Sequence, residues 1–283
     1  MNQPDLYAKS NQITRTTIGD LLDKYIGLMR WQSDEKNVTI LDIGCGDGGV
    51  LFDSLLPKLP QNFHKLYGID ISQEFLDYAS KRNNDKRIVF EKFDIASNEL
   101  PLKYCQQFDH AFSFYCLHWV ADQKKAFENI YNMLKPGGDM MLAFLGIYPL
   151  FAIYEILAKT SKWSKYMYDF DKFISPYHHS RRPDVEMEHL LTRQGFISLE
   201  CQAIPSLFTF ETLISFIQLI KAVNPFISRL PEDEVDNYLD DFVGEVRQMK
   251  NFTIETDENG REGRIQMAYE LLFVVASKPE DSQ

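Results

Sequence analysis

A glycine-rich turn contains the first residues that could do chemistry. The segment Leu41–Gly48 reads LDIGCGDG and overlaps the end of an apolar run, Val38–Ile43. Glycines let the backbone approach a ligand closely, and a strand-to-helix turn of this kind is typical of a nucleotide-like cofactor site. The spacing differs from the G-x-G-x-x-G of dinucleotide sites. The acidic residue before the glycines favours a cationic amino-acid group over a phosphate, so the predicted cofactor residues here are Asp42, Gly44, Cys45 and Gly46.

Two further carboxylates follow the next apolar runs. Asp70 comes directly after Lys65–Ile69, where a carboxylate can accept hydrogen bonds from ribose hydroxyls. Asp94 follows Arg87–Phe93, and we expect it to meet an adenine amino group. Each Asp alone is equally well explained as a cap or turn residue, but together with the glycine turn they indicate a cofactor site. Its predicted remainder consists of Ile71, Ile95 and Ser113.

His118 and Trp119 follow a fourth apolar run, Phe108–Phe114. That position corresponds to the carboxyl edge of the sheet, where ligands bind in open α/β folds. The alternative interpretation is a packed aromatic ring and a histidine at the solvent edge. Both residues are therefore candidates for contact with a second substrate.

Alternating apolar runs and helical patterns must position these side chains. Pro136, Gly137 and Gly138 end a helix and turn the chain before a fifth strand. Such alternation predicts an α/β fold with right-handed crossovers. We expect a Rossmann-like sheet of seven mostly parallel strands with helices on both faces. The predicted strands are 38–43, 65–69, 87–93, 108–114, 139–145, 196–203 and 266–277, and the predicted helices include 50–59, one capped by Ser72, 122–134 and 185–194.

Two stretches exceed a minimal sheet and are interpreted as helical lid insertions, at about 146–183 and 205–263. Leu207–Pro225 has helix-spaced Phe, Leu and Ile residues, and Pro231–Lys250 is an acidic amphipathic helix. Asn251–Arg264 is polar and is predicted to be a loop. We expect one domain over residues 1–283, with its cofactor-binding core at 38–145.

Composition restricts the partners. The chain has 283 residues, a formal charge of −11 and a pI near 5.1, which argues against a nucleic-acid partner. The start lacks the layout of a secretory signal and no apolar run is long enough to span a membrane, so a cytoplasmic location is expected. The four cysteines are widely spaced, so neither a metal motif nor a disulfide framework is predicted. The sequence leaves open whether the chain forms a homodimer.

The turn Asp42–Gly46 and the later carboxylates resemble motifs of the class I S-adenosylmethionine methyltransferases. Four further segments are similar to the insect juvenile hormone acid O-methyltransferases over essentially the whole chain; they are Asp5–Tyr7, Ser113–Val120, Lys162–Ser164 and Phe173–His178. The resemblance implies S-adenosylmethionine as cofactor and a small hydrophobic carboxylic acid, farnesoic acid or juvenile hormone acid, as acceptor. It also implies that Trp119 and a glutamine near the N-terminus hold the carboxylate. This chain has Thr14 at the glutamine position and Gln12 two residues earlier.

A carboxylic acid with a pKa of about 4 to 5 is already ionised at neutral pH, so its methylation needs no general base. Catalysis then depends on placement, for which Trp119, His118 and Gln12 are the candidate residues. Three alternatives stay open. One is methylation of another small acid or a phenol, and another is a harder acceptor with His118 as base. The third is cofactor binding without turnover, which the departure at Thr14 suggests.

Overall fold

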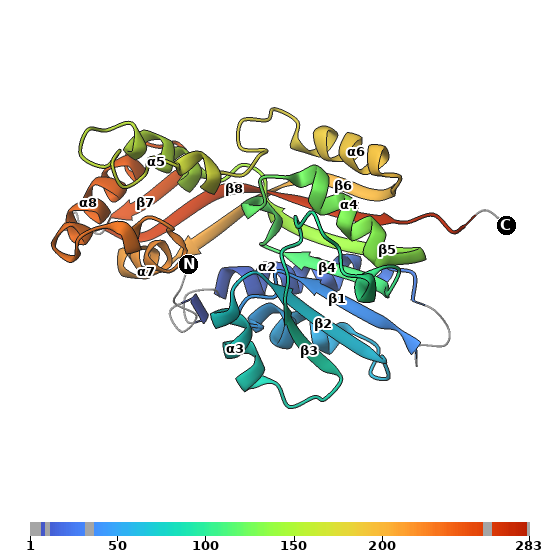
Figure 1. The fold of residues 1–283 in the computed structure, drawn as a ribbon. Coiled ribbons are helices and arrows are strands. Elements are labelled where there is room, and N and C mark those ends of the chain that lie inside the picture. The colour runs from blue at the N-terminus through green and yellow to red at the C-terminus, as the bar shows by residue number, and fades with distance from the viewer. Residues whose placement is uncertain (1–6, 9–11, 32–36, 257–261, 282–283) are drawn as a thin grey trace.

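Five parallel strands form one part of the sheet. The computed structural model describes residues 7–8, 12–31, 37–256 and 262–281. Among these residues the sheet order is β3-β2-β1-β4-β5-β8-β6, and β7 pairs with β8 outside this path (Figure 1). β8 is antiparallel to β5, β6 and β7. The strands are β1 (Thr39–Ile43), β2 (Lys65–Asp70), β3 (Ile88–Lys92), β4 (Phe108–Phe114), β5 (Leu134–Leu145), β6 (Ile197–Phe210), β7 (Phe252–Thr256) and β8 (Glu262–Ser277).

The central strands are apolar on both faces because both faces are covered. Every residue of β1 and β4 is buried. Along β5, alternate residues enter opposite cores: Met141 and Ala143 join one cluster, whereas Met140 and Leu142 join the other. This follows from the two-residue repeat of a strand. It explains why these strands appear in the sequence as unbroken apolar runs.

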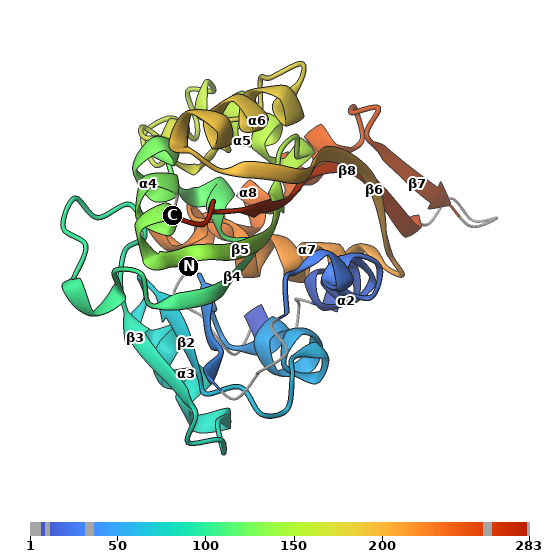
Figure 2. The same ribbon diagram turned by 90° about the vertical axis from the view of Figure 1, so that its right-hand side faces the viewer.

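Helices cover both faces. One core cluster contains residues of α4 and α6, and the other contains residues of α2 and of the π-helical turn η3 (Figure 2). Ser72 caps α3 by accepting the N–H of Phe75, and Gly195 ends α6 in a left-handed conformation. The helices are α2 (Gln12–Tyr25), α3 (Gln73–Arg82), α4 (Gln123–Met133), α5 (Pro149–Ala158), α6 (Pro183–Gln194), α7 (Leu213–Val223) and α8 (Val235–Val246). The short turns are η1 (Ile26–Leu28), η3 (Leu51–Leu55), η4 (Leu56–Lys58), η5 (Leu102–Tyr104), η6 (Leu117–Trp119), η7 (Phe170–Phe173), η8 (Ile227–Arg229) and η9 (Glu232–Glu234).

A second lobe is built on the ends of β6 and β8. These strands pair from Ile197–Ser277 at one end to Phe210–Ile265 at the other. Figure 1 shows them running from the sheet into the lobe that holds α5, α7, α8 and β7. α5 and α7 both pack on β8. The long antiparallel pair therefore carries the segments that the sequence analysis interpreted as insertions.

The seven predicted strands and the Rossmann-like fold class are confirmed, but several local predictions are wrong. Phe252–Thr256 is strand β7, not loop, because its backbone pairs with β8. The segment expected as a helix at 50–59 is helical, but as a π-helical turn followed by a 3-10 turn that contains Pro57, whose missing N–H cannot continue α-helical hydrogen bonding. Residues 207–210 extend β6, and the helix begins only at Leu213. Pro231–Lys250 is helical as α8 over Val235–Val246.

No helix in the described part of the chain combines the length and the apolar character required to cross a membrane.

Candidate active site

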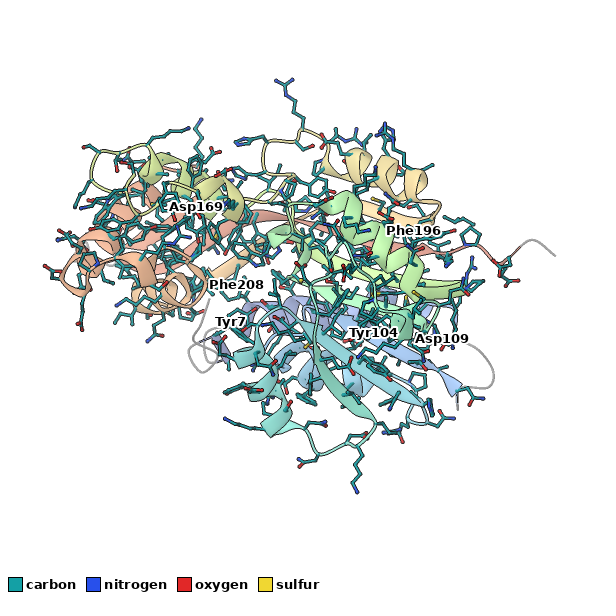
Figure 3. All side chains as sticks on the ribbon, in the orientation of Figure 1. Tyr7, Tyr104, Asp109, Asp169, Phe196 and Phe208 are labelled. Carbon is teal, nitrogen blue, oxygen red and sulfur yellow. The ribbon has the colours of Figure 1, made fainter. Side chains whose placement is uncertain are left out.

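A cavity of about 510 Å³ opens at the carboxyl edge of the parallel strands. Its walls come from the segments after β1, β2, β3 and β4, and from α2, α5 and α7. In Figure 3, Tyr7 lies at this edge, whereas Asp109, near the start of β4, lies at the opposite edge. Because parallel strands end together, side chains far apart in sequence meet here.

The glycine turn forms the floor of one end of the cavity. Gly44 has φ +69°, and a Cβ at this position would lie 2.2 Å from Sγ of Cys116. Gly46 has φ +53°, and its N–H donates to Oδ2 of Asp70 at 3.0 Å. Oδ1 of Asp70 accepts the N–H of Ser72 at 2.9 Å. The turn therefore requires glycine for both conformation and space, and Asp70 is held rigidly beside it.

Asp42 is almost fully buried and borders a small recess of about 30 Å³ that shares Gly44 and Gly46 with the main cavity. Burial, with the nearby Asp70 carboxylate adding to it, raises the pKa of Asp42 to about 7. Cys45 also borders the recess. A buried carboxylate beside a second one is stabilised by a cationic partner. This end of the site thus suits a positively charged ligand group.

The other predicted cofactor residues divide into two groups. Asp94, Ile71 and Ile95 line the main cavity. The Asp94 carboxylate accepts the N–H of Ala96 at 2.9 Å and is exposed, which leaves acceptor positions for a ligand. Ser113 is not among the lining residues: its Oγ donates to the carbonyl of Ile43 at 2.9 Å and ties β4 to β1. The expectation for Ser113 therefore rests on the sequence alone.

Trp119 and His118 line the cavity from the turn η6. The Trp119 ring packs 4.8 Å from the ring of His118 and 6.0 Å from that of Phe151. Within the described part of the chain its indole N–H has no hydrogen-bond partner, so this donor is available to a ligand. Both residues were predicted to lie at this edge of the sheet because they follow the fourth strand in the sequence.

His118 is buried and uncharged. Burial lowers its pKa to about 3, and Nδ1 accepts the N–H of Leu145 at 3.4 Å. A backbone N–H can only donate, so the proton of the neutral ring lies on Nε2. With so low a pKa, His118 is a poor proton acceptor at neutral pH. The geometry therefore favours a hydrogen-bond donor over a base.

The N-terminal candidates are placed in part. Gln12 begins α2, but its side chain lies outside the described residues. Thr14 is buried and lines both the main cavity and the recess. The position that the resemblance assigns to a glutamine thus faces the site.

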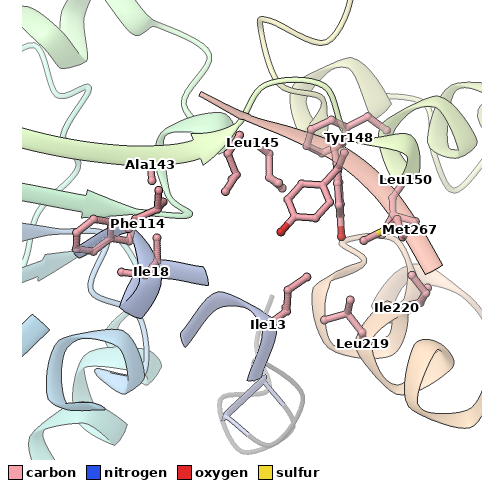
Figure 4. Close-up of a cluster of buried hydrophobic side chains, with 14 of the residues drawn as sticks. Ile13, Ile18, Phe114, Ala143, Leu145, Tyr148, Leu150, Leu219, Ile220 and Met267 are labelled. Atoms are coloured by element: carbon pink, nitrogen blue, oxygen red, sulfur yellow. The ribbon is translucent and has the colours of Figure 1, made fainter. Parts of the chain in front are cut away.

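Several lining residues were not predicted individually. Figure 4 shows Ile13, Leu145, Tyr148 and Leu219 around a common space. Tyr115 lies in Ser113–Val120, one of the segments that carry the family resemblance, and the α5 and α7 residues belong to the predicted insertions. No sequence signal indicated Tyr269. Its hydroxyl lies 3.3 Å from that of Tyr115, 154 residues away. The residues that form this largely apolar wall are Ile13, Tyr115, Leu145, Tyr148, Phe151, Tyr154, Leu219, Val223 and Tyr269.

The glycine turn and the carboxylates at successive strand ends fit S-adenosylmethionine, which has cationic groups, a ribose and an adenine. A family model described as a methyltransferase domain matches residues 41–142. The fold and the site define a class I S-adenosylmethionine-dependent methyltransferase, with S-adenosylmethionine as its cofactor.

Comparison with known proteins identifies the family within this class of methyltransferases. The chain is 39% identical over 280 residues to the juvenile hormone acid O-methyltransferase of Drosophila melanogaster, covering 98% of this chain and 93% of that one. It is 36% identical to the Bombyx mori protein of the same name, covering 98% of both. The chain belongs to the juvenile hormone acid O-methyltransferase family. Among solved structures, the YcgJ protein of Bacillus subtilis shares the fold at TM-score 0.58 and 14% identity, covering 94% of this chain and 99% of that one.

Proposed function

We propose that this enzyme transfers the methyl group of S-adenosylmethionine to the carboxylate of an isoprenoid acid, juvenile hormone acid or farnesoic acid. The observation that carries the proposal is one continuous cavity with two chemically different ends. One end has the glycine turn and the carboxylates, and the other is walled by aromatic and aliphatic side chains. The names of the two insect relatives support the same acceptor.

At the cofactor end, we assign the cationic amino-acid group to Asp42 and the backbone of Gly44, Cys45 and Gly46. We assign the ribose hydroxyls to Asp70 and the adenine to Asp94 with Ile71 and Ile95, all of which line the cavity. When bound, the cofactor supplies an electrophilic methyl group on a sulfonium. Ser113 acts through the strand pairing that positions the turn.

At the acceptor end, the free indole N–H of Trp119 donates to a carboxylate oxygen and orients it toward the methyl donor. His118 supplies a second donor through its protonated Nε2. The acceptor is ionised before it binds, so no residue has to remove a proton. The reaction joins an anion and a cation into neutral products, and the apolar wall favours it by excluding water. The contribution of this chain to catalysis is to orient the two reactants, which can lower the activation barrier by as much as roughly 7 to 11 kcal/mol.

A harder acceptor would require a base, and the low pKa of His118 argues against that alternative. Two alternatives are distinguished from the proposal by experiment. One is cofactor binding without turnover, and the other is methylation of another small acid or a phenol.

The test is a mass-spectrometric assay with S-adenosylmethionine and a panel of acceptors. We expect methyl esters from farnesoic acid and juvenile hormone acid and no product from farnesol, which has the same chain but no carboxylate. Preference for a phenol or a short polyacid would overturn the acceptor while leaving the methyltransferase class intact. Cofactor binding with no product from any acceptor would show a protein without turnover.

A further inference from the structure

Behind the acceptor cavity, three side chains with metal-ligating atoms converge. Glu155 lies on α5, and His178 and His179 lie on the turn after η7. One ligand atom from each lies within 4.8 Å of the other two. From the wide spacing of the cysteines no metal site was predicted, and Glu155 and His179, 24 residues apart, form no short sequence motif. Tertiary structure alone brings them together.

The cluster is more than an ion pair. Nε2 of His179 and Oε1 of Glu155 are 2.7 Å apart, which already accounts for one histidine. His178 lies beside this pair, and its Nδ1 is buried without a hydrogen-bond partner in the described part of the chain. A bound cation would supply the partner that this ring lacks.

The backbone under the two histidines is fixed in place. The N–H of His178 donates to the carbonyl of Ser175 at 2.9 Å, and Ser175 is buried. Between them, the ring of Tyr177 is buried and its hydroxyl lies 3.5 Å from Oε1 of Gln123 on α4. Ligands on a backbone anchored in this way lose little freedom when they bind an ion.

We propose that Glu155, His178 and His179 form a Zn²⁺ site that joins α5 to the 175–180 turn. Two imidazoles and one carboxylate are a set that Zn²⁺ accepts, with a water molecule in the fourth position. Bonds of about 2.0 Å at tetrahedral angles place ligand atoms roughly 3.3 Å apart. Rotation of the His179 side chain, which is 71% exposed, can bring the ligand atoms to these separations.

A single aromatic ring, that of Phe151, separates the proposed metal site from the acceptor end of the cavity. Phe151, one helical turn before Glu155 on α5, contacts His178 edge-on with ring centroids 5.6 Å apart. The same ring lines the cavity and lies 6.0 Å from Trp119. Bound Zn²⁺ would therefore hold this wall of the cavity in place. Metal binding itself does not depend on which acid is the acceptor.

The experiment is calorimetric titration of the full chain, without an affinity tag, with ZnCl₂. We expect one ion per chain with a dissociation constant in the micromolar range or below, and no binding of Mg²⁺, which prefers oxygen ligands. Glu155→Gln and His178→Ala should each weaken Zn²⁺ binding at least tenfold. His189→Ala, which removes an exposed histidine on α6, should leave it unchanged.

Thermal unfolding of each variant in EDTA checks that it folds. If His178→Ala is unstable, His179→Asn tests the site at an exposed position. Co²⁺ in place of Zn²⁺ reports the ligands, and an intense thiolate charge-transfer band would show binding by cysteines instead. That band, a wild-type chain that takes up no stoichiometric Zn²⁺, or variants that bind as tightly as wild type would each overturn the proposal.

Discussion

At the scale of single residues, the cofactor end of the cavity brings two carboxylates, Asp42 and Asp70, close together. Asp42 is buried near Asp70, and its pKa is raised to about 7. A group in this state is protonated in much of the free protein at neutral pH. The cationic cofactor binds the ionised form, so binding must release the proton.

This predicts a pH-dependent cofactor affinity. Below pH 7 the free carboxyl of Asp42 is protonated, and S-adenosylmethionine affinity should fall by up to tenfold per pH unit as the pH decreases. Calorimetry from pH 5.5 to 8.0 measures this. Asp42→Asn should bind more weakly at pH 8 and show little dependence on pH. A wild-type affinity that is constant over this range would contradict the assignment of Asp42.

Asp70 gives a second residue-scale prediction. Its carboxylate is already held by two backbone N–H groups, so it is rigid before the cofactor binds. Asp70→Ala should weaken S-adenosylmethionine binding by about 1 to 3 kcal/mol, through loss of charge-assisted hydrogen bonds to the ribose. Ser72→Ala, which removes a helix cap next to it, serves as a control for local loosening. Unchanged affinity in Asp70→Ala would exclude this role.

Trp119 and His118 can be separated by kinetics. Trp119→Phe keeps the ring wall and deletes the donor, so we expect kcat to fall roughly 10-fold to 100-fold, or about 1.4 to 2.7 kcal/mol, with unchanged cofactor affinity. Because the pKa of His118 is about 3, kcat should show no histidine limb near pH 6.5. If Trp119→Phe retains full kcat, the indole is packing only. A limb near pH 6.5 that vanishes in His118→Gln would restore the base mechanism.

At the scale of elements, α5 and α7 bring the apolar wall to the edge of the sheet. Phe151 and Tyr154 come from α5, and Leu219 and Val223 from α7. Both helices pack on β8, so the acceptor end is carried by the last strand of the sheet. The cofactor end, in contrast, is built from strand ends and their turns. Changes in α7 should therefore alter acceptor choice without disturbing cofactor binding.

Leu219→Trp tests this separation. The larger ring would occupy space meant for the acceptor chain, where each buried methylene contributes about 0.8 kcal/mol. We expect the apparent affinity for C15 acids to fall while shorter acids are affected less, with the dissociation constant of S-adenosylmethionine unchanged. Ile214→Trp, at a position 69% exposed on the same helix, is the matched control. A uniform loss across the acid series would argue against α7 as the determinant of chain length.

At the scale of the whole molecule, β6 and β8 connect the two lobes. Their pairing is continuous apart from one irregularity at Ser198–Glu200. β6 ends and β8 begins inside the second lobe. Neither lobe retains its core if these strands separate. The molecule should therefore unfold as one cooperative unit.

Tryptophan fluorescence can test this cooperativity. Trp163 is buried in the second lobe and donates to Oδ2 of Asp241 at 2.9 Å. A variant with Trp31→Phe and Trp119→Phe leaves Trp163 as the sole tryptophan of this chain, which has three. Its fluorescence transition should coincide with that of far-UV circular dichroism, and S-adenosylmethionine should raise both midpoints. Separate transitions would show that the lobes unfold independently.

The sequence by itself determined the fold class and every strand of the described residues except β7, and it predicted the edge of the sheet at which the candidate cofactor residues lie. Buried parallel strands require apolar runs, and the residues at or shortly after the end of each run lie at the same edge of the sheet. For that reason Asp42, Asp70, Asp94 and Trp119 could be placed from local pattern alone. These features depend on neighbours in sequence, which periodicity and turn residues record.

Tertiary structure decided what depends on distant contacts. The pairing of β7 with β8, the meeting of Tyr269 with Tyr115 and the convergence of Glu155 with two histidines each join segments that no local pattern connects. The uncharged state of His118 follows from burial among side chains of other elements. Which side chains line a cavity is set by how segments pack and pair, and a change of one residue in strand register reverses which face a side chain occupies. The acceptor end is therefore a property of the assembled fold.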